Sequence, residues 1–226
     1  MTNTSTMSSH HFVKENQEPA LIIANGQPCT EELLGQLLEW SPYVIVLDGA
    51  LDKVMSLGVK FDVLLGDFDR LEANQELFPN QPDIEIVHTP DQNKTDLEKA
   101  LDFLIDKGQK AVNIVWATGL RMDHTFNNIC TLGKYTPKIN AVIIDNYSKI
   151  YVLPNDFKKF YSKGQVLSLF ALGEVKGINT KGLLYNLNNE SLSIVERSGS
   201  SNESAETGMV EISYKDGILI LMECND

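Results

Sequence analysis

The stretch IEIVHTPDQNKTDLEKALDFLIDKG, residues 84–108, contains the alternation that decides the fold. An apolar run opens it, and a polar segment with helix-start residues follows. Apolar residues then recur with the period of an amphipathic helix, at Leu97, Ala100, Leu101, Leu104 and Ile105. Thr95 and Glu98 have the spacing of a capping box, which predicts that the helix begins at Asp96. Gly108 stands where a helix commonly ends. The stretch therefore predicts a strand, a turn and a helix in succession.

Similar apolar runs occur throughout the first part of the chain, at residues 20–24, 43–47, 63–65, 112–116 and 139–144. They are nearly continuous, which is typical of parallel strands covered on both faces. From Tyr147 onward the runs are short and separated by turn residues, at 151–153, 166–170, 183–185, 192–195, 209–213 and 218–222. The polar segment 198–208 predicts a long loop.

These patterns predict an α/β fold in which a Rossmann-like parallel-sheet domain is followed by an all-β sandwich domain. We expect a disordered leader over residues 1–18, an α/β domain over 19–146 and the β-sandwich over 147–226.

Charge and composition exclude several classes of protein. The 226 residues contain 19 Lys and Arg against 31 Asp and Glu, a net charge of −12, and no basic cluster interrupts the acidic excess. Nucleic-acid binding through phosphate neutralisation is therefore disfavoured. No apolar run approaches the roughly 20 residues that cross a bilayer, and the polar start is unlike a secretion signal, so we expect a cytoplasmic protein without membrane contact.

Acidic side chains follow successive predicted strands. Asp48, Asp67, Asp69 and Asp96 each come after an apolar run. In an open α/β sheet the carboxyl ends of the strands form the ligand-binding edge, so these carboxylates are expected to converge. Asp67 and Asp69 would point the same way from an extended segment, with Phe68 toward the core. Each Asp taken alone is well explained as a turn or cap residue, but four together favour a Mg²⁺ site that shares its ion with phosphates.

A polyphosphate also needs cations and donors at that edge. Arg121 in a glycine-containing turn, Lys94 and the neutral Gln92 would supply them. A plain surface ion pair between Arg121 and Asp123 is the alternative that spacing leaves open. A P-loop motif and a GxGxxG motif after a strand are both missing from the sequence, so these nucleotide-binding classes lose their main support.

Taken in order, six motifs resemble those of the thiamine pyrophosphokinase (thiamine diphosphokinase) family over about residues 20–222. They are Asp48-Gly49-Ala50, Gly66-Asp67-Phe68-Asp69, residues 89–97, residues 119–124 with Asn127 and Asn128, Thr180-Lys181-Gly182-Leu183 with Tyr185 and Leu187, and Gly199-Ser200-Ser201-Asn202-Glu203. The resemblance implies a homodimer with active sites between subunits, and transfer of the pyrophosphoryl group of ATP to thiamine, giving thiamine diphosphate and AMP.

The resemblance also implies roles for single residues. Mg²⁺ would be held by Asp67, Asp69 and Asp96, and ATP would be contacted by Gln92, Lys94, Arg121 and Asp123. Thiamine would be contacted by Asp48, Tyr185, Ser201 and Asn202. The residues expected to carry catalysis are Asp48, Asp69, Asp96 and Arg121.

Three departures from the family pattern leave two other functions open. Arg70 stands where a Ser is usual, the glycine-rich turn is reduced to residues 119–124, and Tyr185 stands where many members have Trp. A non-catalytic module that binds thiamine or a nucleotide would show binding without AMP release. A different Mg²⁺-dependent phosphoryl or nucleotidyl transferase would leave the motif at 199–203 without a purpose.

Overall fold

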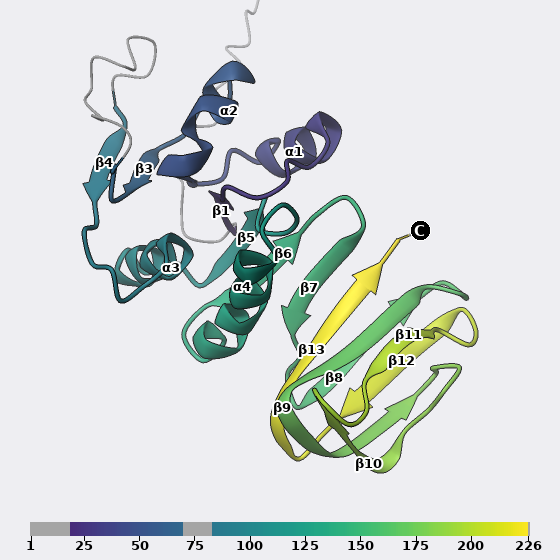
Figure 1. Cartoon of the computed structure of the whole chain (residues 1–226). Helices are drawn as coiled ribbons and strands as arrows, with labels where there is room; N and C mark the ends of the chain where they lie inside the picture. Colours follow the sequence, from purple (N-terminus) through teal and green to yellow (C-terminus); the bar gives the residue numbers. More distant parts are fainter. Residues whose placement is uncertain (1–18, 70–82, 226) are drawn as a thin grey trace, which may run out of the picture.

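The computed structural model of the chain describes residues 19–69 and 83–225 (Figure 1). The predicted leader 1–18 and Arg70 lie outside the described residues. Among those described, no helix has the length and apolar character needed to span a bilayer. The cytoplasmic location stays a prediction.

Six parallel strands form the first half of the chain. They are β1 (Ala20–Ile23), β2 (Val44–Leu47), β3 (Val63–Gly66), β4 (Glu85–His88), β5 (Ala111–Val115) and β6 (Asn140–Ile144), and they lie in the order β4-β3-β2-β1-β5-β6. All six predicted strands are confirmed, with ends shifted by at most one residue. The strand order reverses at β1, which lies between β2 and β5, and ligands of open α/β sheets bind at such reversal points.

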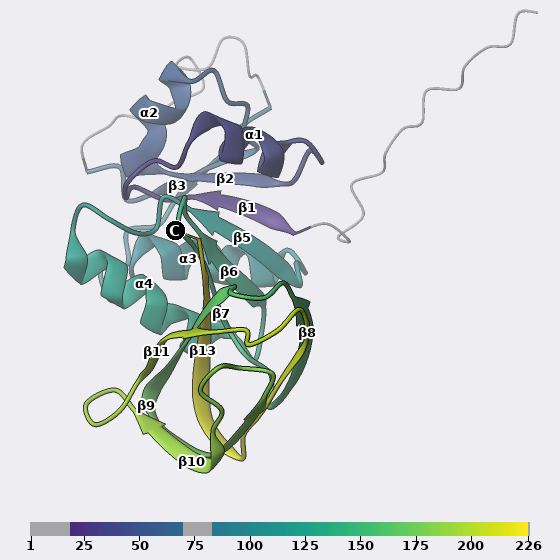
Figure 2. The same ribbon diagram turned by 90° about the vertical axis from the view of Figure 1, so that its right-hand side faces the viewer.

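Helices cover both faces of this parallel sheet. The first part of the chain contains the helices α1 (Glu31–Leu38), η1 (Asp48–Ala50), α2 (Leu51–Ser56), α3 (Asp96–Asp106) and α4 (Met122–Tyr135). One core cluster joins the sheet to α3 and α4 through Leu101 and Leu132, and the other joins it to α1 and α2 through Leu34 and Val54. Figure 2 shows the two helix pairs on opposite sides of the sheet. The central strands β1, β2 and β3 are buried along their whole length, which explains their continuous apolar runs, whereas the edge strand β4 is partly exposed.

The sheet continues into the second half of the chain as antiparallel strands. β7 (Ser148–Val152) pairs with β6, β13 (Asp216–Cys224) pairs with β7, and β9 (Val166–Lys181) pairs with β13. In addition to β13, the long strand β9 pairs with three further strands, β10 (Asn188–Ser193), β11 (Gly199–Glu203) and β12 (Gly208–Ser213). The last strand of this half, β8 (Asp156–Tyr161), pairs with β12. The result is a mixed sheet, parallel then antiparallel, whose second half encloses a third core cluster.

Two predictions for the second half are wrong. Residues 199–203 form β11 instead of part of a long loop, because pairing with β9 satisfies their backbone groups although the side chains are polar. Residues 183–185 are not a strand and contribute one isolated bridge, between Leu183 and Ser204. The edge strand β8 was not predicted, because its sequence DFKKFY contains no continuous run of apolar residues.

Candidate functional site

Asp48 ties the end of β2 to the end of β3. Its Oδ2 accepts a hydrogen bond from the Phe68 amide at 3.0 Å and its Oδ1 accepts one from the Gly49 amide at 2.6 Å. The carboxyl group lies against Gly66, where an added Cβ would come within 2.2 Å of the Asp48 Cγ. Glycine at position 66 therefore makes room for this carboxylate beside the sheet.

Asp67 and Asp69 lie on a tight turn at the end of β3. Phe68 has a φ of 55°, so the segment is not extended and the predicted parallel orientation of the two carboxylates is wrong. The Asp67 Oδ1 instead accepts the Asp69 amide at 3.3 Å, while Phe68 packs on the core as predicted. Asp67 is half-buried and Asp69 is exposed.

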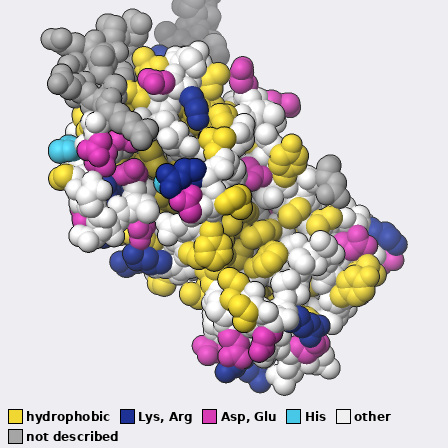
Figure 3. Space-filling view, in the orientation of Figure 1, with side chains coloured by type: hydrophobic (Ala, Val, Ile, Leu, Met, Phe, Trp, Pro, Cys, Tyr) yellow, Lys and Arg dark blue, Asp and Glu magenta, His cyan; other side chains and the backbone are white. Residues whose placement is uncertain are grey.

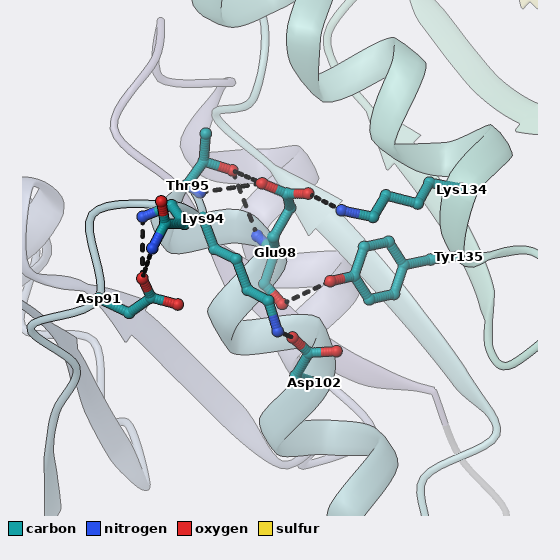
Figure 4. A network of polar contacts seen from close by, with 8 residues as sticks. Asp91, Lys94, Thr95, Glu98, Asp102, Lys134 and Tyr135 are labelled. Carbon is teal, nitrogen blue, oxygen red and sulfur yellow. Dashed lines mark hydrogen bonds and ion pairs between the residues drawn. The ribbon is translucent and has the colours of Figure 1, made fainter.

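Asp96 is the first residue of α3, next to the ends of β2 and β3. The predicted capping box is present, with the Glu98 Oε2 accepting the Thr95 amide at 2.9 Å (Figure 4). The other Glu98 oxygen accepts a bond from Lys134 on α4 at 2.5 Å. The start of α3 is therefore fixed both by its own cap and by the neighbouring helix.

Asp48, Asp67 and Asp96 are close enough to influence one another electrostatically. Burial raises the pKa of Asp48, and the charges of Asp96 and Asp67 add to that rise. The Asp69 amide and the Gln92 side chain hold the pKa of Asp67 below its usual value, with a further contribution from Lys99. The charges of Asp67 and Asp96 therefore reach Asp48, and a shared ion site among the strand-end carboxylates stays a prediction.

The three carboxylates suit a hard cation that takes part of its coordination from a ligand. Among residues 19–69 and 83–225, no group of three or more His, Cys, Asp or Glu side chains is arranged so that it could hold a metal ion. Mg²⁺ in phosphate-transfer sites typically uses only one or two protein carboxylates, with waters and phosphate oxygens as its other ligands. The predicted ligands Asp67, Asp69 and Asp96 offer carboxylate oxygens of the kind that Mg²⁺ takes, and the metal site stays a prediction.

The predicted ATP-binding residues divide into those near the carboxylates and those paired elsewhere. Gln92 Nε2 donates to Asp67 Oδ2 at 3.3 Å. Lys94 forms an ion pair with Asp102 on α3 at 2.8 Å (Figure 4). Arg121 pairs with Asp123 at 2.5 Å, and the two side chains are 72% and 63% exposed. The surface pair that the sequence left open is therefore present, with the guanidinium accessible to a ligand.

Three of the four predicted thiamine-binding residues, Tyr185, Ser201 and Asn202, lie in the second half of the chain, whereas Asp48 follows β2 in the first half. The Tyr185 side chain is 68% exposed, whereas Asn202 on β11 is buried. Asn202 Oδ1 accepts the Tyr185 amide at 3.1 Å and its Nδ2 donates to the Tyr185 carbonyl at 2.8 Å. Ser201 has a φ of 56°, and its amide donates to Ser168 Oγ at 2.9 Å. The Asn202 amide group thus holds the Tyr185 backbone, a role that sequence reasoning missed.

Replacing Asn202 by Ala is expected to lower the free energy of unfolding by about 1–3 kcal/mol, because the two hydrogen bonds from the buried Asn202 side chain to the Tyr185 backbone are lost. It is also expected to raise the KM for thiamine by freeing the segment that carries the Tyr185 ring. Urea unfolding and steady-state kinetics measure the two effects. The exposed neighbour Asn188 supplies the control in the Asn188→Ala variant. If Asn202→Ala had the wild-type free energy of unfolding, the hydrogen bonds from Asn202 to the Tyr185 backbone would not stabilise the fold.

The two groups of predicted residues are separated within one chain. Figure 1 shows β11 in the antiparallel half of the molecule and β3, which Asp67 follows, in the parallel half. The structure therefore brings the carboxylates together and brings Tyr185, Ser201 and Asn202 together, but does not join the two sets.

Two domain models of one family match the chain. The model described as "Thiamin pyrophosphokinase, catalytic domain" matches residues 34–144, and the model described as "Thiamin pyrophosphokinase, vitamin B1 binding domain" matches residues 152–219. The chain belongs to the thiamin pyrophosphokinase family. The matched ranges follow the change from parallel to antiparallel strands, and the resemblance seen in the sequence motifs is confirmed.

Individual thiamin pyrophosphokinases are similar to the chain at modest identity. The thiamine pyrophosphokinase of Bacillus subtilis is 27% identical over 166 residues, which cover 71% of this chain and 77% of that protein. Thiamin pyrophosphokinase 1 of Caenorhabditis elegans is 27% identical over 143 residues, 58% of this chain and 56% of that protein.

Solved structures of the family share the fold. The thiamin pyrophosphokinase of Geobacillus thermodenitrificans superposes with a TM-score of 0.77 at 25% identity, covering 92% of this chain and 98% of that chain. The yeast enzyme gives the same TM-score of 0.77 at 15% identity, covering 94% and 88%. The fold is therefore retained across large differences in sequence.

Proposed function

We propose that the chain transfers the pyrophosphoryl group of ATP to the hydroxyl of thiamine, releasing AMP. The observation that carries this function is the presence of both family domains in one chain. The chain is an enzyme of the thiamine pyrophosphokinase type. In this proposal a Rossmann-like half binds the nucleotide and a sandwich half binds thiamine.

The reaction needs attack at the β-phosphorus. The thiamine oxygen forms a bond to that phosphorus, the bridge between the α- and β-phosphates breaks, and AMP leaves with the bonding electron pair while the hydroxyl proton passes to solvent. Asp48 would orient the hydroxyl by accepting its hydrogen bond. Phosphoryl-type transfer depends mainly on positioning and charge neutralisation, so the chain's contribution is to hold the two substrates in line.

Asp67 and Asp96 would hold Mg²⁺ with Asp48 beside them, and we place the exposed Asp69 at the outer side of the same group. Bound there, Mg²⁺ would neutralise the phosphate oxygens during transfer. Gln92 would donate from its amide to the polyphosphate, and Lys94 and Arg121 would bring positive charge. Both cations are paired with a carboxylate, so each would exchange that partner for phosphate oxygens on ATP binding.

Arg121→Ala is expected to lower the rate of AMP formation about 10²-fold, because a charge-stabilising donor is lost from the transition state. The melting temperature is expected to stay unchanged, since the side chain is 72% exposed. Single-turnover kinetics and a thermal melt compare the two quantities. A loss of stability that matched the loss of rate would show that Arg121 is structural.

We propose that the working form is a homodimer. Tyr185, Ser201 and Asn202 lie in the antiparallel half of the chain and Asp48, Asp67 and Asp96 in the parallel half, so a second copy would bring the two groups together. Figure 3 shows hydrophobic side chains gathered over α4 and the strands beside it. Leu120, Met122 and Phe126 near the start of α4 are 64%, 70% and 56% exposed, an apolar surface suited to burial against another subunit. A monomer in equilibrium sedimentation at working concentration would contradict this assembly.

Quantifying the phosphorus-containing products separates the proposed function from its alternatives. With ATP, thiamine and Mg²⁺, ³¹P NMR should show AMP and thiamine diphosphate formed in equal amounts, with no AMP when thiamine is omitted. A non-catalytic module would bind thiamine and form neither product. Formation of ADP, or of pyrophosphate without thiamine diphosphate, would identify a different transferase.

A further inference from the structure

Lys99 is a buried lysine beside the proposed metal site. It lies in the first turn of α3, one helical turn after Asp96, and only 7% of its side chain is exposed. Its Nζ donates to Asp96 Oδ1 at 3.1 Å. Lysine is almost never this buried unless its charge has a partner. The burial therefore fixes a positive charge at the inner side of the acidic group.

The charge of Lys99 acts on more than the one carboxylate it contacts. It contributes to lowering the pKa of Asp67 at the end of β3 and of Asp91 in the segment before α3. Lys94, which precedes the helix, instead donates to Asp102. Asp67 follows β3, Asp91 precedes α3 and Asp96 begins α3, whereas Lys99 lies on α3, which packs against one face of the sheet.

We propose that Lys99 is a positioning residue that serves as a fixed internal counter-ion for Asp96. This inference rests on the proposed function of the same site. A fixed positive charge beside metal ligands repels a divalent cation and attracts a polyphosphate. Lys99 therefore keeps the affinity for the free ion low and makes ion binding depend on the nucleotide. The site loads the metal together with ATP, and the carboxylates are neutralised while the site is vacant.

The test measures the binding of Mn²⁺ alone, by electron paramagnetic resonance, to the full chain and its variants. Lys99→Met keeps the length of the buried stem and removes the charge, so Mn²⁺ should bind about tenfold more tightly or better than to the wild type. Lys99→Arg keeps the charge and should leave the Mn²⁺ affinity unchanged. Adding ATP should strengthen Mn²⁺ binding much less in Lys99→Met than in the wild type.

Lys107→Met is the matched control, because Lys107 follows the last turn of the same helix and pairs with Glu85 at 3.1 Å. It should bind Mn²⁺ as the wild type does. Lys99→Gln provides a second neutral variant if Lys99→Met does not fold, as judged by circular dichroism. Mn²⁺ binding that is unchanged, weaker or undetectable in the folded neutral variant would overturn the proposal.

The outcome is separable from that of the proposed function. If Mn²⁺ binds more tightly to Lys99→Met but wild-type protein makes no AMP from ATP and thiamine, the counter-ion role stands and the reaction assigned to the site fails. If AMP forms normally and Mn²⁺ affinity does not respond to the charge at position 99, the function stands and the counter-ion role fails.

Discussion

Asp96→Asn is expected to lower the rate of thiamine-dependent AMP formation by about 10³-fold or more, the largest loss of any single substitution in the chain. Asparagine has nearly the same shape but offers one neutral oxygen in place of a carboxylate. The variant should keep its fold, because asparagine can still accept the Lys99 hydrogen bond, but its melting temperature should fall modestly, because the buried Lys99 loses the charge of its partner. Quenched-flow measurement of AMP and a thermal melt give the two values.

The control for Asp96→Asn uses the other end of the same helix. Asp106 is the last residue of α3 and is exposed, and Asp106→Asn should retain the wild-type rate. If Asp96→Asn formed AMP at more than half the wild-type rate, the carboxylate could not be a ligand of the reacting ion. If it lost its fold, Asp96 would be a structural cap instead.

Gly66→Ala is expected to have the second-largest effect, and it acts through Asp48. The new Cβ would lie 2.2 Å from the Asp48 Cγ and 2.6 Å from its Cβ, so the whole short side chain must move. Asp48 would lose its bond to the Phe68 amide, and the turn that carries Asp67 would lose its anchor. Displacement of groups by about 1 Å commonly costs about 10² in rate, and overpacking costs about 1–3 kcal/mol of stability.

The control for Gly66→Ala is the same substitution at a glycine that has open space around it. Gly35 lies within α1 and an added Cβ there meets nothing within 4 Å, so Gly35→Ala should leave the rate unchanged and raise stability slightly. Denaturant unfolding and initial rates provide both numbers. A Gly66→Ala enzyme with the wild-type rate would show that the position of Asp48 does not matter for the reaction.

The parallel half of the fold was predictable because local and tertiary signals agree there. The run at residues 63–65 is apolar because β3 is buried on both faces, and Thr95 and Glu98 cap α3 by their own side chains. The second half was less predictable. β11 is made of Gly, Ser, Asn and Glu, and its strand conformation comes from pairing with β9 rather than from its own side chains.

The convergence of Asp48, Asp67 and Asp96 followed from topology, because strand ends of a parallel sheet meet at one edge. The left-handed backbone of Phe68 had no sequence signal, since only the contact between Asp48 and the Phe68 amide requires it. The ion pair between Lys99 and Asp96 was indicated in the sequence only by their spacing of three residues, which is common on any helix.

The most direct test of the central claim locates the ion itself. Crystals of the protein with Mn²⁺, an ATP analogue with a methylene group between the α- and β-phosphates, and thiamine should give an anomalous difference peak between Asp67 and Asp96, about 2.1–2.2 Å from a carboxylate oxygen and from analogue phosphate oxygens. In the same crystals, the hydroxyl group of thiamine should face the β-phosphorus of the analogue. Full occupancy of nucleotide and thiamine with the Mn²⁺ peak away from all three carboxylates would contradict this claim.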